Sequence, residues 1–85
     1  MGNITFANGA VYSCSFLSTV DGTAFVALDD VSFAEAAVIF ADENMTRDME
    51  WGEYRLIGYT QLMGLYVQPY GIQAVLKGGH DERRS

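Results

Sequence analysis

The segment 31–42, VSFAEAAVIFAD, constrains the fold most, because it alone combines a helical period with a start signal. Ser32 and Glu35 form a capping-box pattern, in which each side chain bonds a backbone N–H of the first turn. Apolar residues recur at the i, i+3, i+4 and i+7 positions of one stripe. We therefore expect an α-helix over about residues 32–42, with these residues facing a sheet: Phe33, Ala36, Ala37 and Phe40.

The chain before this helix alternates β-prone runs with turn signals. Asn8-Gly9 and Asp21-Gly22 are dipeptides that tolerate positive φ, so they predict tight turns between the strands 3–7, 10–20 and 23–28. In the second strand, the alternation of side chains places Cys14 on the same face as two aromatic residues, Tyr12 and Phe16. We expect Cys14 to be a small buried apolar residue rather than a reactive thiol.

The chain after the helix also reads as strands and turns. The segment 54–68 contains Gly58 and Gly64, which indicate either one bent strand or two shorter ones. A last strand follows, with three residues facing inward: Ile72, Ala74 and Leu76. We predict an α+β fold of order βββαβββ, in which the helix packs on a bent antiparallel sheet or small open β-barrel of about six strands. Residues 1–77 then form one domain, and residues 78–85 form a flexible tail.

Composition excludes several classes of protein. The 85 residues contain five Lys and Arg against eleven Asp and Glu, so the net charge is −6 and direct binding to nucleic acid is not expected. One Cys excludes an internal disulfide and a cysteine-based zinc site. The longest uncharged run, 56–76, contains polar and turn residues, which argue against a membrane span. Residues 1–9 lack the features of a signal peptide, so we expect a cytosolic location.

No combination of residues points to catalysis. The one histidine, His80, lies in the expected tail, without the orienting partner that a catalytic base needs. We expect no enzyme activity, no cofactor and no metal ion. Acidic residues gather between positions 42 and 53, in a spacing that fits no calcium loop. They favour a solvated acidic rim, and they are the candidates for an acidic face that mimics nucleic acid: Asp42, Glu43, Asp48, Glu50 and Glu53.

The aromatic and methionine residues are the most informative for function. Six of them fall within twenty residues: Trp51, Tyr54, Tyr59, Met63, Tyr66 and Tyr70. Trp and Tyr are enriched at interface hot spots, although about half of these residues are expected to belong to the core. The helix has a second apolar face, which a lone soluble helix would more often make charged: Ala34, Val38 and Ala41. These two groups predict a protein-binding surface.

Three pieces of the sequence carry a resemblance to a group of proteins. ITFANG, then SFAEAAVIFAD with MT after it, and GYTQLMGLYVQPYGIQAVLK resemble small acidic proteins encoded in phages and prophages of gut bacteria. The resemblance covers about residues 4–77 as an overall pattern. It implies a phage setting, a location in the host bacterial cytoplasm or within a virion, and no catalytic residues.

We therefore expect a non-enzymatic phage-type binding or assembly protein, such as a head, connector or tail accessory component of a virion. Its partner would be another protein or further copies of itself, in a homo-oligomer or larger assembly. The alternative is an acidic inhibitor of a host defence nuclease complex, of the anti-CRISPR kind. Neither hypothesis involves a membrane.

Overall fold

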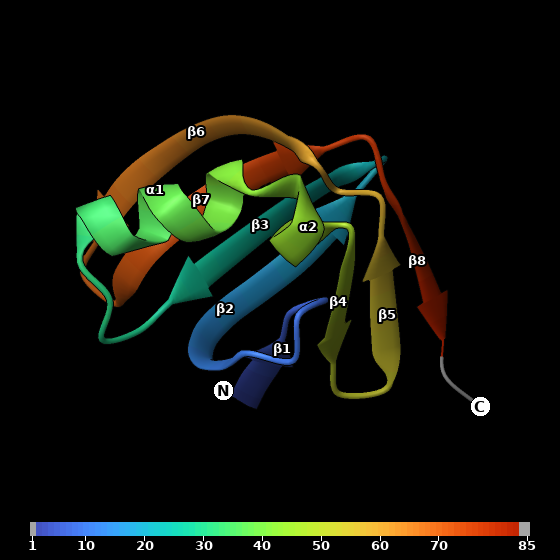
Figure 1. Cartoon of the computed structure of the whole chain (residues 1–85), viewed down its shortest axis with the longest axis horizontal. Coiled ribbons are helices and arrows are strands. Elements are labelled where there is room, and N and C mark those ends of the chain that lie inside the picture. Colours follow the sequence, from blue (N-terminus) through green and yellow to red (C-terminus); the bar gives the residue numbers. More distant parts are fainter. Residues whose placement is uncertain (1, 84–85) are drawn as a thin grey trace.

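Residues 2–83 are described by the computed structural model, and they form one antiparallel sheet and two helices (Figure 1). In chain order the elements are β1 (Gly2–Thr5), β2 (Val11–Val20), β3 (Thr23–Leu28), α1 (Phe33–Ala41), α2 (Glu43–Thr46), β4 (Asp48–Trp51), β5 (Tyr54–Ile57), β6 (Gln61–Gln68), β7 (Gly71–Lys77) and β8 (His80–Arg83). The strand order in the sheet is β6-β7-β3-β2-β1-β4-β5-β8.

The α+β class with one antiparallel sheet is thus confirmed, but the expected number of about six strands is wrong, because the sheet has eight. It is an open sheet, with β6 and β8 at its edges. The segment 54–68 forms two strands, β5 and β6. Residues 80–83, predicted to belong to the flexible tail, instead form β8 and pair with β5.

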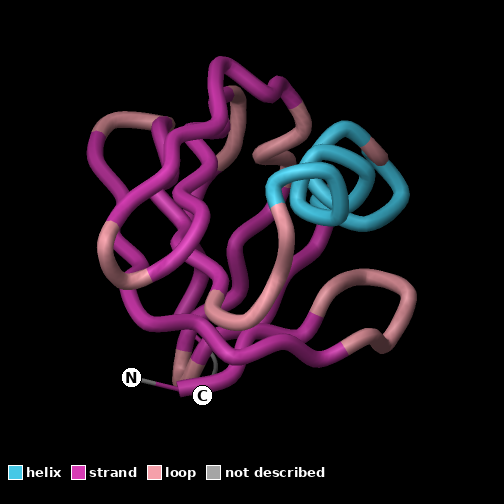
Figure 2. The backbone as a smooth tube through the Cα atoms, turned by 90° about the vertical axis from the view of Figure 1, so that its left-hand side faces the viewer, coloured by secondary structure: helices cyan, strands magenta, loops and turns pink. Residues whose placement is uncertain are grey.

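The long strand β2 bends the sheet. Its first half pairs with β1 and its second half with β3, so the two parts of the sheet diverge from this strand. The turn after β2 lies close to the connection between β7 and β8, where the N–H of Gly78 donates to the carbonyl of Gly22 at 3.0 Å. Figure 2 shows the resulting curl of the strands, with the helices to one side.

A β-bulge corrects the predicted faces of β2. The register shifts between Cys14 and Phe16, so one extra residue reverses the alternation of side chains along the strand. Cys14 is buried, as predicted, but Phe16 is 43% exposed on the opposite face of the sheet. The expected common face of Tyr12, Cys14 and Phe16 is therefore wrong beyond the bulge.

Helix α1 begins as the sequence predicts. The Ser32 side chain accepts a hydrogen bond from the N–H of Glu35 at 3.1 Å, so Ser32 is the N-cap. The buried residues of the helix are Ala36, Ile39 and Phe40. Phe33, predicted to be in the core, is 49% exposed, because a helical stripe does not reveal how far the sheet extends beneath it.

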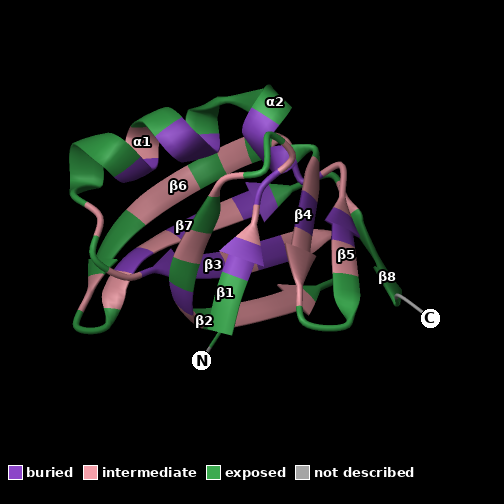
Figure 3. Cartoon of the chain, turned by 60° about the horizontal axis from the view of Figure 1, so that its bottom comes forward, coloured by how far each residue is buried: buried purple, intermediate pink, exposed green. Residues whose placement is uncertain are grey.

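The core lies between the helices and the inner face of the sheet. It contains the three inward-facing residues predicted on β7, together with residues from every strand between β7 and β5 in the sheet (Figure 3). In contrast, β8 is exposed along its whole length. Within residues 2–83, neither helix is long and apolar enough to cross a membrane.

Candidate functional site

A row of side chains crosses the outer face of the sheet, on the side away from the helices. In the strand register, Tyr66 of β6 lies opposite Gln73 of β7, which lies opposite Ala27 of β3, which lies opposite Phe16 of β2. Residues directly opposite one another on paired strands share a face. This row brings Phe16 and Tyr66 to one face, although they are far apart in the sequence.

Tyr70 joins this row from the turn between β6 and β7. Its ring centroid is 6.1 Å from that of Phe16, and its hydroxyl donates to Gln73 Oε1 at 2.9 Å. The Ser15 hydroxyl donates to the Tyr70 carbonyl at 3.0 Å. Hydrogen bonds therefore fix both the backbone and the hydroxyl of Tyr70. We call Phe16, Tyr66 and Tyr70 the aromatic surface, and their exposed fractions are 43%, 52% and 44%.

The aromatic surface ends at the sheet edge formed by β6. This strand reads QLMGLYVQ and contains no ionisable side chain except Tyr66. Two further apolar residues of the strand are exposed, Met63 at 49% and Val67 at 74%. On an edge strand, backbone N–H and C=O groups point away from the sheet and are available to another strand. An aromatic surface beside such an edge is suited to contact another protein.

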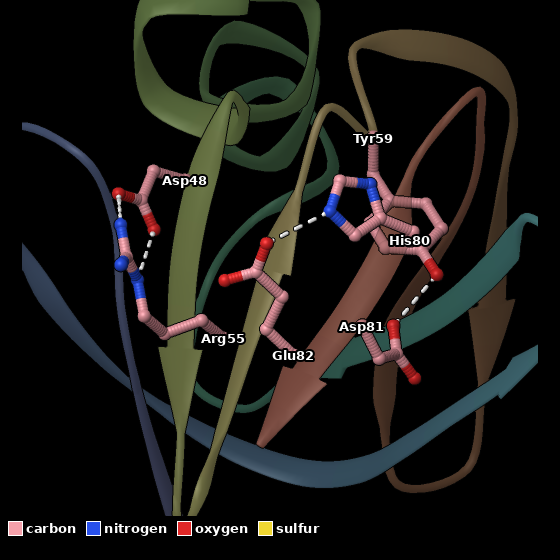
Figure 4. Close-up of polar contacts among 6 residues, drawn as sticks. All are labelled: Asp48, Arg55, Tyr59, His80, Asp81 and Glu82. Carbon is pink, nitrogen blue, oxygen red and sulfur yellow. Dashed lines mark hydrogen bonds and ion pairs between the residues drawn. The ribbon is translucent and has the colours of Figure 1, made fainter. Parts of the chain in front are cut away.

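The outer face near the opposite edge carries charges instead. Glu50 of β4, Arg55 of β5 and Glu82 of β8 lie opposite one another in the register. Arg55 also binds Asp48 at 2.5 Å, and this hydrogen bond is the largest cause of the raised pKa of the guanidinium. Figure 4 shows this pair next to Glu82, which contacts His80 at 3.0 Å. Here alternating charges cover the outer face of the sheet.

The predicted interface residues separate into several groups. The second face of α1 is exposed along its length, at Ala34, Val38 and Ala41. Met63, Tyr66 and Tyr70 are exposed and lie on or beside β6. Tyr54 of β5 is 40% exposed, whereas Trp51 of β4 is half-buried against the core. The structure therefore does not bring these candidates together on one surface.

Tyr59 is not available to a partner. Its side chain is 1% exposed, and its hydroxyl donates to Asp81 Oδ1 at 2.7 Å (Figure 4). Burial, followed by this hydrogen bond to a carboxylate, raises the pKa of Tyr59 well above its usual range. The expectation of an interface role for Tyr59 is corrected to a structural one, the attachment of β8.

The acidic candidates do not form one face. Asp42 caps α2 by accepting from the N–H of Asn44 at 2.9 Å, and Glu43 opens the same helix. The other three lie on β4 or in the following turn: Asp48, Glu50 and Glu53. Asp48 binds Arg55 and Glu53 binds Arg83 at 3.1 Å, so both have cationic partners. Among the described residues no group of three or more His, Cys, Asp or Glu could hold a metal ion.

Sequence reasoning missed Phe16 as a surface residue, because nothing in the sequence of β2 locates the bulge. Cys14 is buried, as predicted: burial raises the pKa of its thiol, which donates to the carbonyl of Phe16 at 3.1 Å.

We compared the chain with models of protein families, with curated proteins and with solved structures, and none of them matches it.

Proposed function

We propose that this protein is a non-enzymatic binding and assembly protein that associates through the β6 edge and the adjoining aromatic surface. Its first partner is a second copy of the chain. The observation that carries the proposal is the uncharged edge strand β6 beside three exposed aromatic residues.

A contact between two β6 edges is the arrangement that the surface supports best. Two identical edge strands related by a twofold axis run antiparallel, and each supplies the same N–H and C=O groups to the other. The residues Gln61 to Gln68 bring no acidic or basic side chain into this contact, so the net charge of −6 is not concentrated there. The aromatic surface then adds apolar area beside the paired edges.

The proposed phage setting rests on the sequence resemblance alone. In that setting an assembling protein of this size would serve as an accessory component of a virion head, connector or tail. The alternative, an acidic inhibitor that occupies a nucleic-acid groove, receives less support, because two of its five candidate carboxylates are bound to arginine.

The test uses two valines that are both 74% exposed, Val67 on β6 and Val38 on α1. Sedimentation velocity from low micromolar to millimolar concentration measures self-association of the wild type, Val67→Lys and Val38→Lys. We expect Val67→Lys to raise the dissociation constant at least about tenfold, or about 1.4 kcal/mol, because a charge enters the paired edge. Val38→Lys makes the same chemical change on the helix and should leave the constant unchanged.

A wild type that remains monomeric over the whole range would contradict self-assembly. If Val38→Lys weakens association and Val67→Lys does not, the second face of α1 is the interface instead. Salt provides an independent check, because an uncharged edge contact should persist at high ionic strength, whereas a contact made by the acidic residues should weaken steeply.

A further inference from the structure

A pocket of about 250 Å³ lies on the inner side of the sheet, away from the β6 edge. It lies between the second half of β2 and the strands β4, β5 and β8, which supply all of its lining residues. Its walls combine aliphatic, aromatic and polar side chains: Leu17, Ser18, Thr19, Trp51, Tyr54, Leu56 and Asp81. The proposed self-association does not use this pocket.

Among residues 2–83, Asp81 supplies the only charged group in the wall of the pocket. Its Oδ1 accepts from the Tyr59 hydroxyl at 2.7 Å, and its Oδ2 accepts from the Thr19 hydroxyl. Both donors are neutral, and no Lys, Arg or His among residues 2–83 pairs with this carboxylate. Because a carboxylate offers about four lone-pair sites, Asp81 can accept further hydrogen bonds, and its charge has no counter-ion within the described part of the chain.

The two hydrogen bonds also fix the position of the carboxylate. Thr19 and Tyr59 approach from different elements, β2 and the β5–β6 connection, and Asp81 itself is held by the pairing of β8 with β5. A preorganised carboxylate binds a cation with a smaller loss of side-chain entropy than a mobile one does.

The other walls suit an organic cation. Trp51 and Tyr54 are aromatic residues, whose rings attract ammonium and guanidinium groups, and Leu17 and Leu56 offer apolar contact to a short alkyl stem. A volume of about 250 Å³ is below the ~300–1,000 Å³ typical of sites for drug-sized ligands, so a group of side-chain size fits best. The net charge of −6 further attracts cations to the protein.

We propose that this pocket binds an alkylammonium or guanidinium group, with Asp81 as the counter-ion and with Trp51 and Tyr54 as aromatic walls. Two sources share this chemistry: a free small amine, and the side chain of a lysine or arginine of a protein.

Trp51 provides a direct readout, because it is the only tryptophan of the chain and lines the pocket. We would titrate the protein with n-butylammonium and with the neutral analogue n-butanol, and follow both the Trp51 indole N–H resonance and its fluorescence. Butylammonium should shift the indole signal saturably, with a dissociation constant on the order of 1 mM. Butanol should bind at least about fivefold more weakly, because it lacks the charge.

Asp81→Asn should weaken butylammonium binding about tenfold, because it removes the counter-ion. The matched control is Glu82→Gln, which makes the same charge change at the next residue of β8, outside the pocket wall, and should leave binding unchanged. Asp81→Asn also disturbs the bonds from Thr19 and Tyr59, so Tyr54→Leu provides a second variant that leaves those bonds in place. It should weaken binding several-fold.

Equal shifts with butanol and butylammonium, or unchanged butylammonium affinity in both Asp81→Asn and Tyr54→Leu, would overturn the proposal. Blocked lysine, N-acetyl-lysine methylamide, separates the two sources of the cation. Binding at least as tight as that of butylammonium supports a protein side chain as the natural occupant, and much weaker binding supports a free amine.

Discussion

The two edges of the sheet differ in almost every property. The β6 edge has eight residues without acidic or basic side chains, beside the exposed aromatic surface. The β8 edge has four residues, HDER, all of them ionisable and exposed. Charged side chains and short strands are two of the ways in which proteins prevent sheet edges from pairing with other chains. The β8 edge has both features and the β6 edge has neither, which indicates that β6 is the edge suited to association.

The two edges are also attached differently. Strand β6 is joined to β7 by a tight hairpin, whose turn lies against the carbonyl of Leu28 in β3. Strand β8 is held by its pairing with β5 and by the side-chain bonds of Asp81 to Tyr59 and Thr19. Both edge strands are thus paired through the backbone, but β8 has additional side-chain hydrogen bonds at Asp81, whereas the β6–β7 turn packs against the backbone of β3.

The largest effect is expected at the β6 hairpin, from Gly71→Ala. Gly71 has φ +146°, and a Cβ atom there would lie 2.2 Å from the carbonyl oxygen of Leu28. The hairpin would have to move away from β3, and we expect a loss of about 3 kcal/mol in the free energy of unfolding, measured by urea denaturation.

Gly9→Ala is the control for Gly71→Ala. Gly9 also has a positive φ, of +90°, but no atom lies within 4 Å of an added Cβ. It should lose only about 1 kcal/mol, from backbone strain alone. Equal losses in the two variants would mean that the contact with Leu28 does not hold the hairpin.

A smaller effect is expected at the β8 edge, from Tyr59→Phe. The substitution removes the hydroxyl that bonds Asp81, and it should cost about 1 kcal/mol near neutral pH. Amide hydrogen exchange of residues 80–83 should accelerate together with this loss. Tyr66→Phe is the control, because Tyr66 is 52% exposed and its hydroxyl forms no hydrogen bond with residues 2–83.

Tyr59→Phe also tests the raised pKa of Tyr59, through the dependence of stability on alkaline pH. The pKa of Tyr59 is raised above its usual value of about 10, so at higher pH this residue ionises first in the unfolded chain. The unfolded state then binds fewer protons than the folded state, and the free energy of unfolding falls as pH rises. The advantage of the wild type over Tyr59→Phe should therefore shrink between pH 9 and about 11. If the difference in free energy of unfolding between the wild type and Tyr59→Phe stays constant over this range, the pKa of Tyr59 is not raised in the folded protein.

The sequence predicts one edge of this comparison much better than the other. The β6–β7 hairpin has β-prone runs separated by Pro69-Tyr70-Gly71, and the inward positions of β7 follow from its alternation. Strand β8 has no apolar alternation, because both of its faces are exposed, and its stability comes from contacts with distant residues. Likewise, the bulge that exposes Phe16 depends on how β2 pairs with β1 and β3, which no local pattern in β2 encodes.

The smallest effect on stability is expected from the charged residues on the outer face of β4, β5 and β8. Arg55→Gln leaves three carboxylates, Asp48, Glu50 and Glu82, near one another without their shared cation. Arg47→Gln makes the same charge change at a residue without an ion pair among residues 2–83. At low salt Arg55→Gln should lower the urea midpoint more than Arg47→Gln, and about 1 M salt should remove the difference by screening. If the difference persists in salt, the Arg55–Asp48 contact between β5 and β4 contributes through packing and hydrogen bonding rather than through charge.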